Sequence, residues 1–102
     1  MITAREINKF ITNYCKEHHI RKGKHELYPL YIHLNGFSHS IGFTNRKLHK
    51  GERATDWTSV HYSAYTQKTW GAFNEHQQYI AYQLLSKIPH YKYQNNAKEI
   101  LL

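Results

Sequence analysis

The dipeptide Asn35-Gly36 stands between two runs, residues 27–34 and 37–44, in which every second residue counted outward from the turn is apolar except His39. Alternation with a period of two is typical of β-strands, because successive side chains point to opposite faces of a sheet. Asn and Gly also tolerate the positive φ values of a two-residue type I′ turn. The sequence therefore predicts a β-hairpin with one apolar face and one polar face.

A two-residue turn would fix the register of this hairpin. The expected pairs are Leu34 with Phe37, Ile32 with His39, Leu30 with Ile41, and Tyr28 with Phe43. These residues form one face that is apolar except for His39, which we expect in the core or at its rim rather than in catalysis. The opposite face carries Pro29, Tyr31, His33, Ser38, Ser40 and Gly42. Because proline donates no ladder hydrogen bond, we expect the strand to be an edge at Pro29.

Two segments outside the hairpin have helical spacing. Thr3 and Glu6 form a capping box before the first segment. Its apolar stripe consists of Ile7, Phe10, Ile11, Tyr14 and Cys15. Asn74 with Gln77 can cap the second segment, which Pro89 ends. The stripe of this second helix consists of Ile80, Ala81, Leu84, Leu85 and Ile88.

Residues 58–66 alternate again and predict a third strand, whereas residues 45–56 are a long polar loop. Residues 90–102 have no clear pattern, and we expect an irregular, loosely packed tail whose last three residues could dock. The prediction is a single α+β domain over residues 1–102. Its order is helix, β-hairpin, long basic loop, third antiparallel strand and helix, with both helices packed on one face of a small antiparallel sheet.

This element order resembles that of double-stranded-RNA-binding domains and of small toxin endoribonucleases with the same topology. The resemblance covers the order of elements and no motif. Double-stranded-RNA-binding domains place a lysine cluster at the start of the second helix, and that stretch here reads Asn74, Glu75, His76, Gln77 and Gln78. We therefore assign the chain to no family on this ground.

The chain carries 14 Lys and Arg residues against seven Asp and Glu, a formal net charge of +7, and nine histidines. Net charge indicates partners rather than fold, and this excess favours nucleic acid ahead of an acidic protein. Cys15 is the only cysteine, so no internal disulfide can form. No stretch approaches the roughly 20 apolar residues of a membrane span, and no apolar signal segment begins the chain. We expect a cytoplasmic protein with no membrane partner.

The basic residues gather in two connections. The long loop holds four of them within eight residues, opposed only by Glu52: Arg46, Lys47, Lys50 and Arg53. The connection after the first helix holds three more: Arg21, Lys22 and Lys24. Such side chains can follow the phosphates of a nucleic acid, with binding that weakens in salt. The alternative is that both connections are simply solvated.

The polar face of the sheet is a second candidate site. Tyr31 and Tyr65 can stack on unpaired bases there. His33 and His61 could instead act as the acid and base of a metal-free ribonuclease. The alternatives are an ordinary wet sheet face or an interface with a protein. Trp57 and Trp70 flank the third strand, and we expect them in the core or in a hydrophobic lid rather than on bases.

We expect no metal and no cofactor. The hairpin points His33 and His39 to opposite faces, and the spacings of zinc-binding motifs are missing. Asp56 is the only aspartate, so the carboxylates of a two-metal nuclease are also missing. No phosphate-binding glycine loop or serine-hydrolase turn occurs.

The leading hypothesis is a small, basic, non-enzymatic nucleic-acid-binding accessory protein that contacts phosphates through its basic loop, with DNA and RNA both open. The first alternative is a small inhibitor or adaptor, of the kind phages and mobile elements encode, that binds a protein partner through surface Tyr and His residues. The second alternative is a metal-independent ribonuclease.

Overall fold

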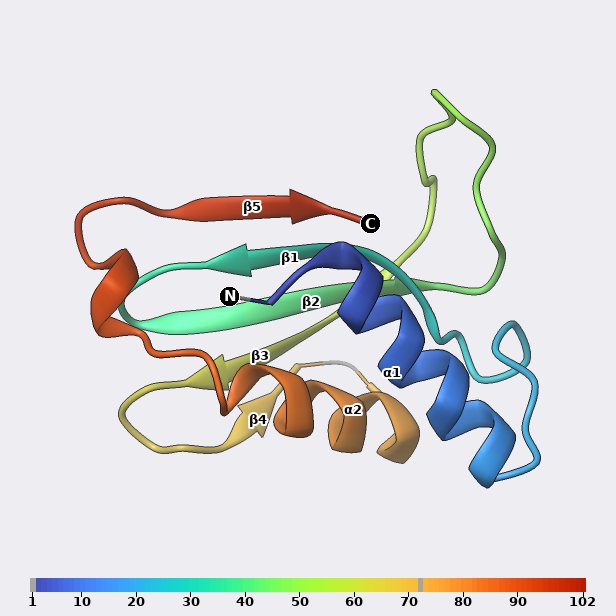
Figure 1. Cartoon of the computed structure of the whole chain (residues 1–102), viewed down its shortest axis with the longest axis horizontal. Coiled ribbons are helices and arrows are strands. Elements are labelled where there is room, and N and C mark those ends of the chain that lie inside the picture. Colours follow the sequence, from blue (N-terminus) through green and yellow to red (C-terminus); the bar gives the residue numbers. More distant parts are fainter. Residues whose placement is uncertain (1, 72) are drawn as a thin grey trace.

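The computed structural model of the chain describes residues 2–71 and 73–102. The elements are α1 (Ala4–Glu17), β1 (Tyr28–Leu34), β2 (Ser38–Thr44), β3 (Thr58–Ser63), β4 (Thr69–Trp70), α2 (Glu75–Leu85), the 3-10 helix η1 (Tyr91–Tyr93) and β5 (Lys98–Leu101). The strands form one antiparallel sheet in the order β4-β3-β2-β1-β5, and both helices lie on one face of it (Figure 1). The predicted α+β fold is confirmed, and the sheet has two strands more than expected.

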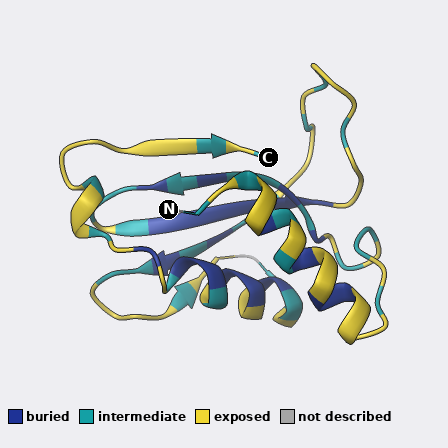
Figure 2. Cartoon of the chain, in the orientation of Figure 1, coloured by how far each residue is buried: buried dark blue, intermediate teal, exposed yellow. Residues whose placement is uncertain are grey.

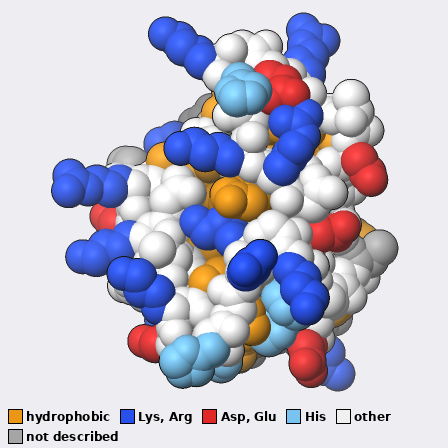
Figure 3. Space-filling model, turned by 90° about the vertical axis from the view of Figure 1, so that its right-hand side faces the viewer, with side chains coloured by type: hydrophobic (Ala, Val, Ile, Leu, Met, Phe, Trp, Pro, Cys, Tyr) orange, Lys and Arg blue, Asp and Glu red, His pale blue; other side chains and the backbone are white. Residues whose placement is uncertain are grey.

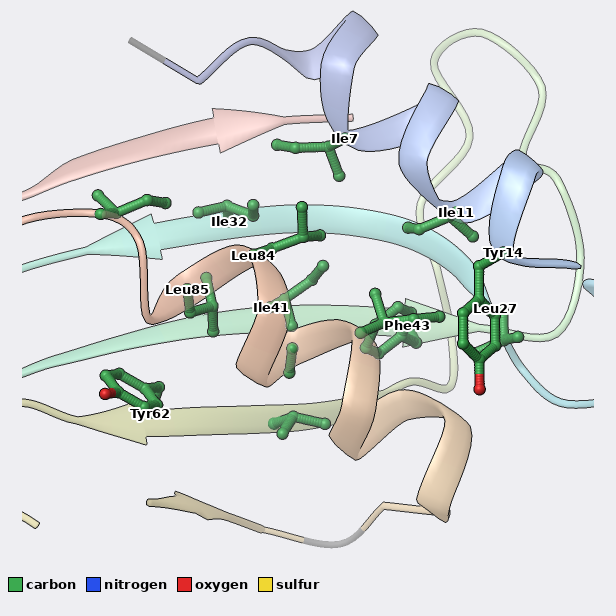
Figure 4. Close-up of a cluster of buried hydrophobic side chains, with 14 of the residues drawn as sticks. Ile7, Ile11, Tyr14, Leu27, Ile32, Ile41, Phe43, Tyr62, Leu84 and Leu85 are labelled. Atoms are coloured by element: carbon green, nitrogen blue, oxygen red, sulfur yellow. The ribbon is translucent and has the colours of Figure 1, made fainter. Parts of the chain in front are cut away.

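The core lies between the helices and the face of the sheet that they cover, which we call the inner face. From α1, Ile7 and Ile11 point to the sheet, and Leu85 does so from α2 (Figure 4). Ile32 and Ile41 meet them from the central strands, and all five side chains are fully buried. Figure 2 shows the same layering, with the buried stripe of each helix turned to the sheet. Both predicted apolar stripes therefore reach the core.

Capping residues begin the two helices where the sequence predicts. Thr3 Oγ1 accepts a hydrogen bond from the Glu6 amide at 3.2 Å, which is one of the two hydrogen bonds of the predicted Thr3–Glu6 capping box. Asn74 and Gln77 form a complete capping box, in which each side chain accepts from the backbone N–H of the other residue. Gln77 also donates to the carbonyl of Glu26 at 2.7 Å, which fixes the start of α2 to the connection before β1.

The register of the hairpin differs from the prediction by two residues. Leu34 pairs with His39 instead of Phe37, and Ile32 pairs with Ile41 instead of His39. Between the turn and Tyr31, a shift of two positions leaves the side chains on their predicted faces, because the period of a strand is two. Ile32, His39 and Ile41 are therefore buried as expected, whereas Phe37 moves into the turn and is exposed.

The side chain of Asn35 explains the wider turn. Its Oδ1 accepts hydrogen bonds from the backbone amides of Phe37 and Ser38, both at 2.8 Å. This arrangement is an alternative to the predicted type I′ turn, and neither Asn35 nor Gly36 has a positive φ. Gly36 serves a different purpose, since a Cβ atom there would lie 2.8 Å from the Cα of Gln94.

A bulge changes the faces at the start of β1. The register passes from Pro29 opposite Phe43 to Tyr31 opposite Gly42, so one residue of β1 is extra. Pro29 is consequently buried, although the sequence predicts it on the polar face. The other predicted pairs, Leu30 with Ile41 and Tyr28 with Phe43, are wrong for the same reason and because of the shifted turn.

The C-terminal segment is ordered, which corrects the expected irregular tail. Strand β5 pairs with residues 31–34 of β1, and the Leu102 amide donates to the Leu30 carbonyl at 3.0 Å. Ile100 lies opposite Ile32 and packs against the core. Because the β5 pairing begins at Tyr31, Pro29 lies beyond it, which agrees with the edge position expected for that proline.

The third strand is shorter than predicted, because Ser63 ends it. Ser63 Oγ accepts hydrogen bonds from the amides of Tyr65 and Thr66 and forms a turn. The chain then returns as β4 beside β3. Tyr65 therefore lies in a turn at the end of the sheet and not within the strand.

Candidate nucleic-acid interface

The two basic connections meet at one end of the molecule. A Cβ atom on Gly23 would lie only 2.8 Å from the carbonyl oxygen of Asn45, so the two backbones touch there. We call residues 21–24 together with the loop of residues 45–57 the basic end. Figure 3 views the molecule from this side and shows Lys and Arg side chains spread across it, with acidic side chains between them and along the margins.

Three of the predicted phosphate-binding residues line a single hollow, which we call the basic groove. Lys22 comes from the first connection, and Arg46 and Lys47 come from the long loop. The groove has a volume of about 430 Å³, and Tyr28 and Leu48 also line it. The Lys22 ammonium lies 5.4 Å from the centre of the Tyr28 ring and donates to Thr12 Oγ1 at 3.1 Å. Lys22 is thus held over the groove by both contacts.

One ion pair shapes the long loop. Arg46 binds both carboxylate oxygens of Glu52, and Glu52 also accepts a hydrogen bond from the His49 amide at 2.9 Å. The hydrogen bonds from Arg46 and then His49 lower the pKa of the Glu52 carboxyl to about 2. Lys47, Lys50 and Arg53 are exposed, and the described part of the chain provides no ion pair for them. Their charges remain available to a partner.

A second hollow, the outer cleft, lies between the long loop and the uncovered outer face of the sheet. Its volume is about 890 Å³, and the residues with functional groups that line it are Tyr31, His33, Ser40, His49, Lys50, Glu52, Arg53, Trp57 and Glu99. Leu30, Leu48 and Leu102 line both this cleft and the basic groove. The two hollows are therefore neighbours, and together they hold five of the seven basic residues predicted to bind nucleic acid.

Arg21 and Lys24 line neither hollow. Both side chains are exposed in the same connection as Lys22. They add positive charge to the basic end without contributing to a wall of the groove. Long-range attraction of a polyanion depends on this summed charge as well as on direct contacts.

Tyr31 lies across the outer face of the sheet. Its ring covers Gly42, where any Cβ atom would overlap the ring. Its hydroxyl forms a hydrogen bond of 2.6 Å with Ser59 Oγ on β3. The ring therefore spans from β1 to β3, and glycine at position 42 is what allows it to lie flat.

His33 and His61 flank Ser40 on the outer face, in one row of the sheet. Their backbones are two strand spacings apart, about 10 Å. His33 lines the outer cleft, whereas His61 stacks on Trp70 with ring centres 4.1 Å apart. Burial lowers the pKa of His61. The structure thus brings the two histidines to the same face but places only His33 beside the basic end.

Neither tryptophan packs in the core, which corrects that part of the expectation for them. Trp57 is 52% exposed and lines the outer cleft, and Trp70 is 53% exposed on top of His61. The sequence could have predicted the position of Trp57. Trp57, Ser59 and His61 are every second residue, and side chains two positions apart in a strand point to the same face, here the outer face.

Tyr65, the other predicted stacking residue, lies away from both hollows. It is 76% exposed in the β3–β4 turn, with its ring stacked on Phe37 at 6.2 Å between ring centres. Figure 1 shows this turn and the basic end at opposite ends of the sheet. Tyr31 and Tyr65 are therefore not parts of one compact site.

Residues 2–71 and 73–102 contain no group of three or more His, Cys, Asp or Glu side chains placed to hold a metal ion. No helix in these ranges is both long and apolar enough to cross a membrane. A comparison with known protein families, curated proteins and solved structures finds no match to this chain. The functional argument therefore depends on the geometry and charge of the chain itself.

Proposed function

We propose that this protein binds nucleic acid and holds its phosphates at the basic end. The observation that carries the proposal is that Lys22, Arg46 and Lys47 line one groove although two separate connections supply them. Lys50 and Arg53 continue the positive charge into the neighbouring outer cleft. Basic residues that merely keep a loop solvated would not need to converge in this way.

The physical basis is release of counterions from the phosphate backbone. Each phosphate that a Lys or Arg neutralises contributes roughly 0.7–0.9 to the slope of log affinity against log salt concentration. Lys47, Lys50 and Arg53 are the most direct candidates, because all three are exposed and outside the Arg46–Glu52 ion pair. Binding of this kind is independent of sequence and needs no catalytic group.

A matched pair of triple variants tests the proposal. One variant replaces Lys47, Lys50 and Arg53 with alanine. The other replaces three exposed lysines of segments at the other end of the sheet (Figure 1): Lys68 in the β3–β4 turn, Lys87 after α2 and Lys92 in η1. Both lose three positive charges. We expect the first variant to bind labelled DNA and RNA at least tenfold more weakly, with a salt slope smaller by about 2 to 3. The second variant should bind nearly as the parent does.

The affinities are measured by fluorescence anisotropy between about 50 mM and 200 mM salt. Equal losses in the two variants would show that only net charge matters and would contradict a site at the basic end. A parent protein that binds neither DNA nor RNA would contradict the proposal altogether. The inhibitor or adaptor role and the ribonuclease role stay predictions from the sequence.

A further inference from the structure

We propose that the outer face of the sheet is a stacking surface for unpaired bases, so that the ligand is a single-stranded nucleic acid. This inference depends on the proposed function, because the phosphates of that strand would lie at the basic end. It adds the class of nucleic acid and assigns a binding role to Trp57, Tyr31 and Trp70.

The first argument is the position of Trp57 in the outer cleft. Its half-exposed ring lines the same hollow as Lys50 and Arg53, two cations of the basic end. An aromatic ring beside unpaired cations is the combination that binds single strands, in which the rings stack on bases and the cations follow the phosphates. Stacking accepts every base, since each base has a π-face.

The second argument is that two more rings are fixed on the same face. The Tyr31 ring is held flat over Gly42 by its hydrogen bond to Ser59, and it also lines the outer cleft. The Trp70 ring is stacked on His61 with 13° between the ring planes, which leaves its other side exposed. Rings that are already ordered lose little conformational entropy when a base stacks on them.

The third argument is that the basic groove and the outer cleft are adjacent. The basic groove and the outer cleft share Leu30, Leu48 and Leu102, so the two hollows adjoin and a strand that passes over these residues reaches both. The bases of a duplex are stacked on one another and cannot offer their faces to these rings, whereas those of a single strand can. Exposed rings on the sheet therefore favour an unpaired strand.

Charge distinguishes this occupant from a protein partner. Glu52 and Glu99 are the acids that line the outer cleft, and Glu52 is already neutralised by Arg46. Lys50 and Arg53 leave the cleft with a positive excess, which matches a polyanion that also carries flat apolar groups. Nucleic acid combines both properties in each nucleotide.

The chain carries its own reporter for the test, because Trp57 and Trp70 are its only tryptophans. The purified protein is titrated with oligo(dT) and oligo(U) of about 20 nucleotides, longer than the ~4–16 nucleotides that one small single-strand-binding fold covers. A DNA duplex of the same length and heparin, a polyanion without bases, serve as comparisons. We expect either single strand to quench tryptophan emission and to bind several-fold more tightly than the duplex, and heparin to leave the emission unchanged.

Substitutions then locate the contact, with binding followed by the anisotropy of a labelled strand. Trp57→Leu and Trp70→Leu should each weaken binding of the single strand by roughly fivefold or more, while binding of the duplex stays unchanged. Tyr79→Leu is the matched control, because Tyr79 is an exposed aromatic residue on α2, over the inner face. Circular dichroism confirms that the variants fold, and all three side chains are exposed enough to be replaced.

The outcomes separate this inference from the proposed function. Duplex binding as tight as single-strand binding, together with unaffected Trp57 and Trp70 variants, would overturn the stacking surface and leave the basic end standing. The same holds if heparin changes the emission as the strand does, since charge alone would then explain it. Loss of all binding in the basic-end variant with full binding in the tryptophan variants would also count against the inference.

Discussion

His39 is the most unusual residue of the core. It is fully buried between the sheet and the segment after α2, and its Nε2 donates to the Ile88 carbonyl at 3.0 Å. Its ring lies nearly parallel to that of His90, with centres 3.6 Å apart, and the Tyr93 ring meets its edge. Among residues 2–71 and 73–102, the buried Nδ1 atom has no hydrogen-bond partner. No acidic side chain in the described part of the chain pairs with His39, so the neutral form of the imidazole is favoured.

This burial predicts a loss of stability in mild acid. Burial is the largest of the effects that lower the pKa of His39 to about 4 from an ordinary value of 6.5. The hydrogen bond to Ile88 partly opposes this shift, whereas the nearby His90 and His33 add to it. Between these two values the unfolded chain binds the proton and the folded chain does not. The contribution of the neutral His39 to the free energy of unfolding is therefore complete above about pH 6.5. It is lost as the pH falls towards 4, and a pKa shift of this size corresponds to about 3 kcal/mol.

Urea unfolding at about pH 7.5 and pH 5 checks this expectation for the parent and for His39→Gln, which cannot titrate but keeps a donor for Ile88. The parent should lose more free energy of unfolding between the two pH values than the variant does. Burial also lowers the pKa of His90, which is present in both proteins and adds a pH dependence of its own to each. An identical pH dependence in the two proteins would show that His39 is not the group responsible.

At the scale of elements, the sequence predicts those parts of the fold that local patterns determine. The Asn74–Gln77 capping box and the apolar stripe of α2 are complete in the sequence, and both are observed. The turn at Asn35 was predicted in the right place but with the wrong geometry. Whether an Asn-Gly pair adopts positive φ or lets the Asn side chain bind two amides depends on tertiary contacts, here the approach of Gln94 to Gly36.

Strand β5 shows why a long-range pairing escapes such reasoning. Its four residues include one that packs against the core, Ile100, so the sequence shows no clear alternation there. The strand forms because the edge of β1 that does not pair with β2 is free to accept it. The residues around Lys98–Leu101 give no indication that such an edge is available. The outer cleft escaped prediction for the same reason, because β5 supplies Glu99 and Leu101 as part of its wall.

Two neighbouring residues of β5 provide a test of its packing. Ile100 faces Ile32 on the inner face, whereas Leu101 points outward and is 78% exposed. We expect Ile100→Lys to lower the free energy of unfolding by about 1–2 kcal/mol, because a charge replaces an apolar contact with the core. Leu101→Lys should change it by less than about 0.5 kcal/mol. Chemical denaturation of both variants measures the difference, and equal effects would mean that β5 does not pack as described.

At the scale of the whole molecule, the charge of +7 is unevenly distributed, with seven basic residues in the two connections of the basic end. Because the connections meet at Gly23 and Asn45, like charges from distant parts of the sequence are brought close by folding. Their repulsion opposes the folded state and is screened by salt, whose Debye length falls from about 30 Å at 0.01 M to about 8 Å at 0.15 M. The concentration of positive charge on which the proposed function depends should therefore destabilise the folded protein.

The stability of the free protein should therefore rise with salt, and the basic end should account for the rise. Between about 0.01 M and 0.15 M NaCl we expect the free energy of unfolding of the parent to increase by on the order of 1 kcal/mol. Alanine at Lys47, Lys50 and Arg53 should remove most of this increase, because it removes the charges that folding brings together. The variant at Lys68, Lys87 and Lys92 has the same net charge and should keep most of it. Thermal or urea unfolding at each salt concentration measures the free energy of unfolding of the parent and of both variants. If the two variants, which have the same net charge, respond to salt equally, folding does not concentrate the repulsion at the basic end.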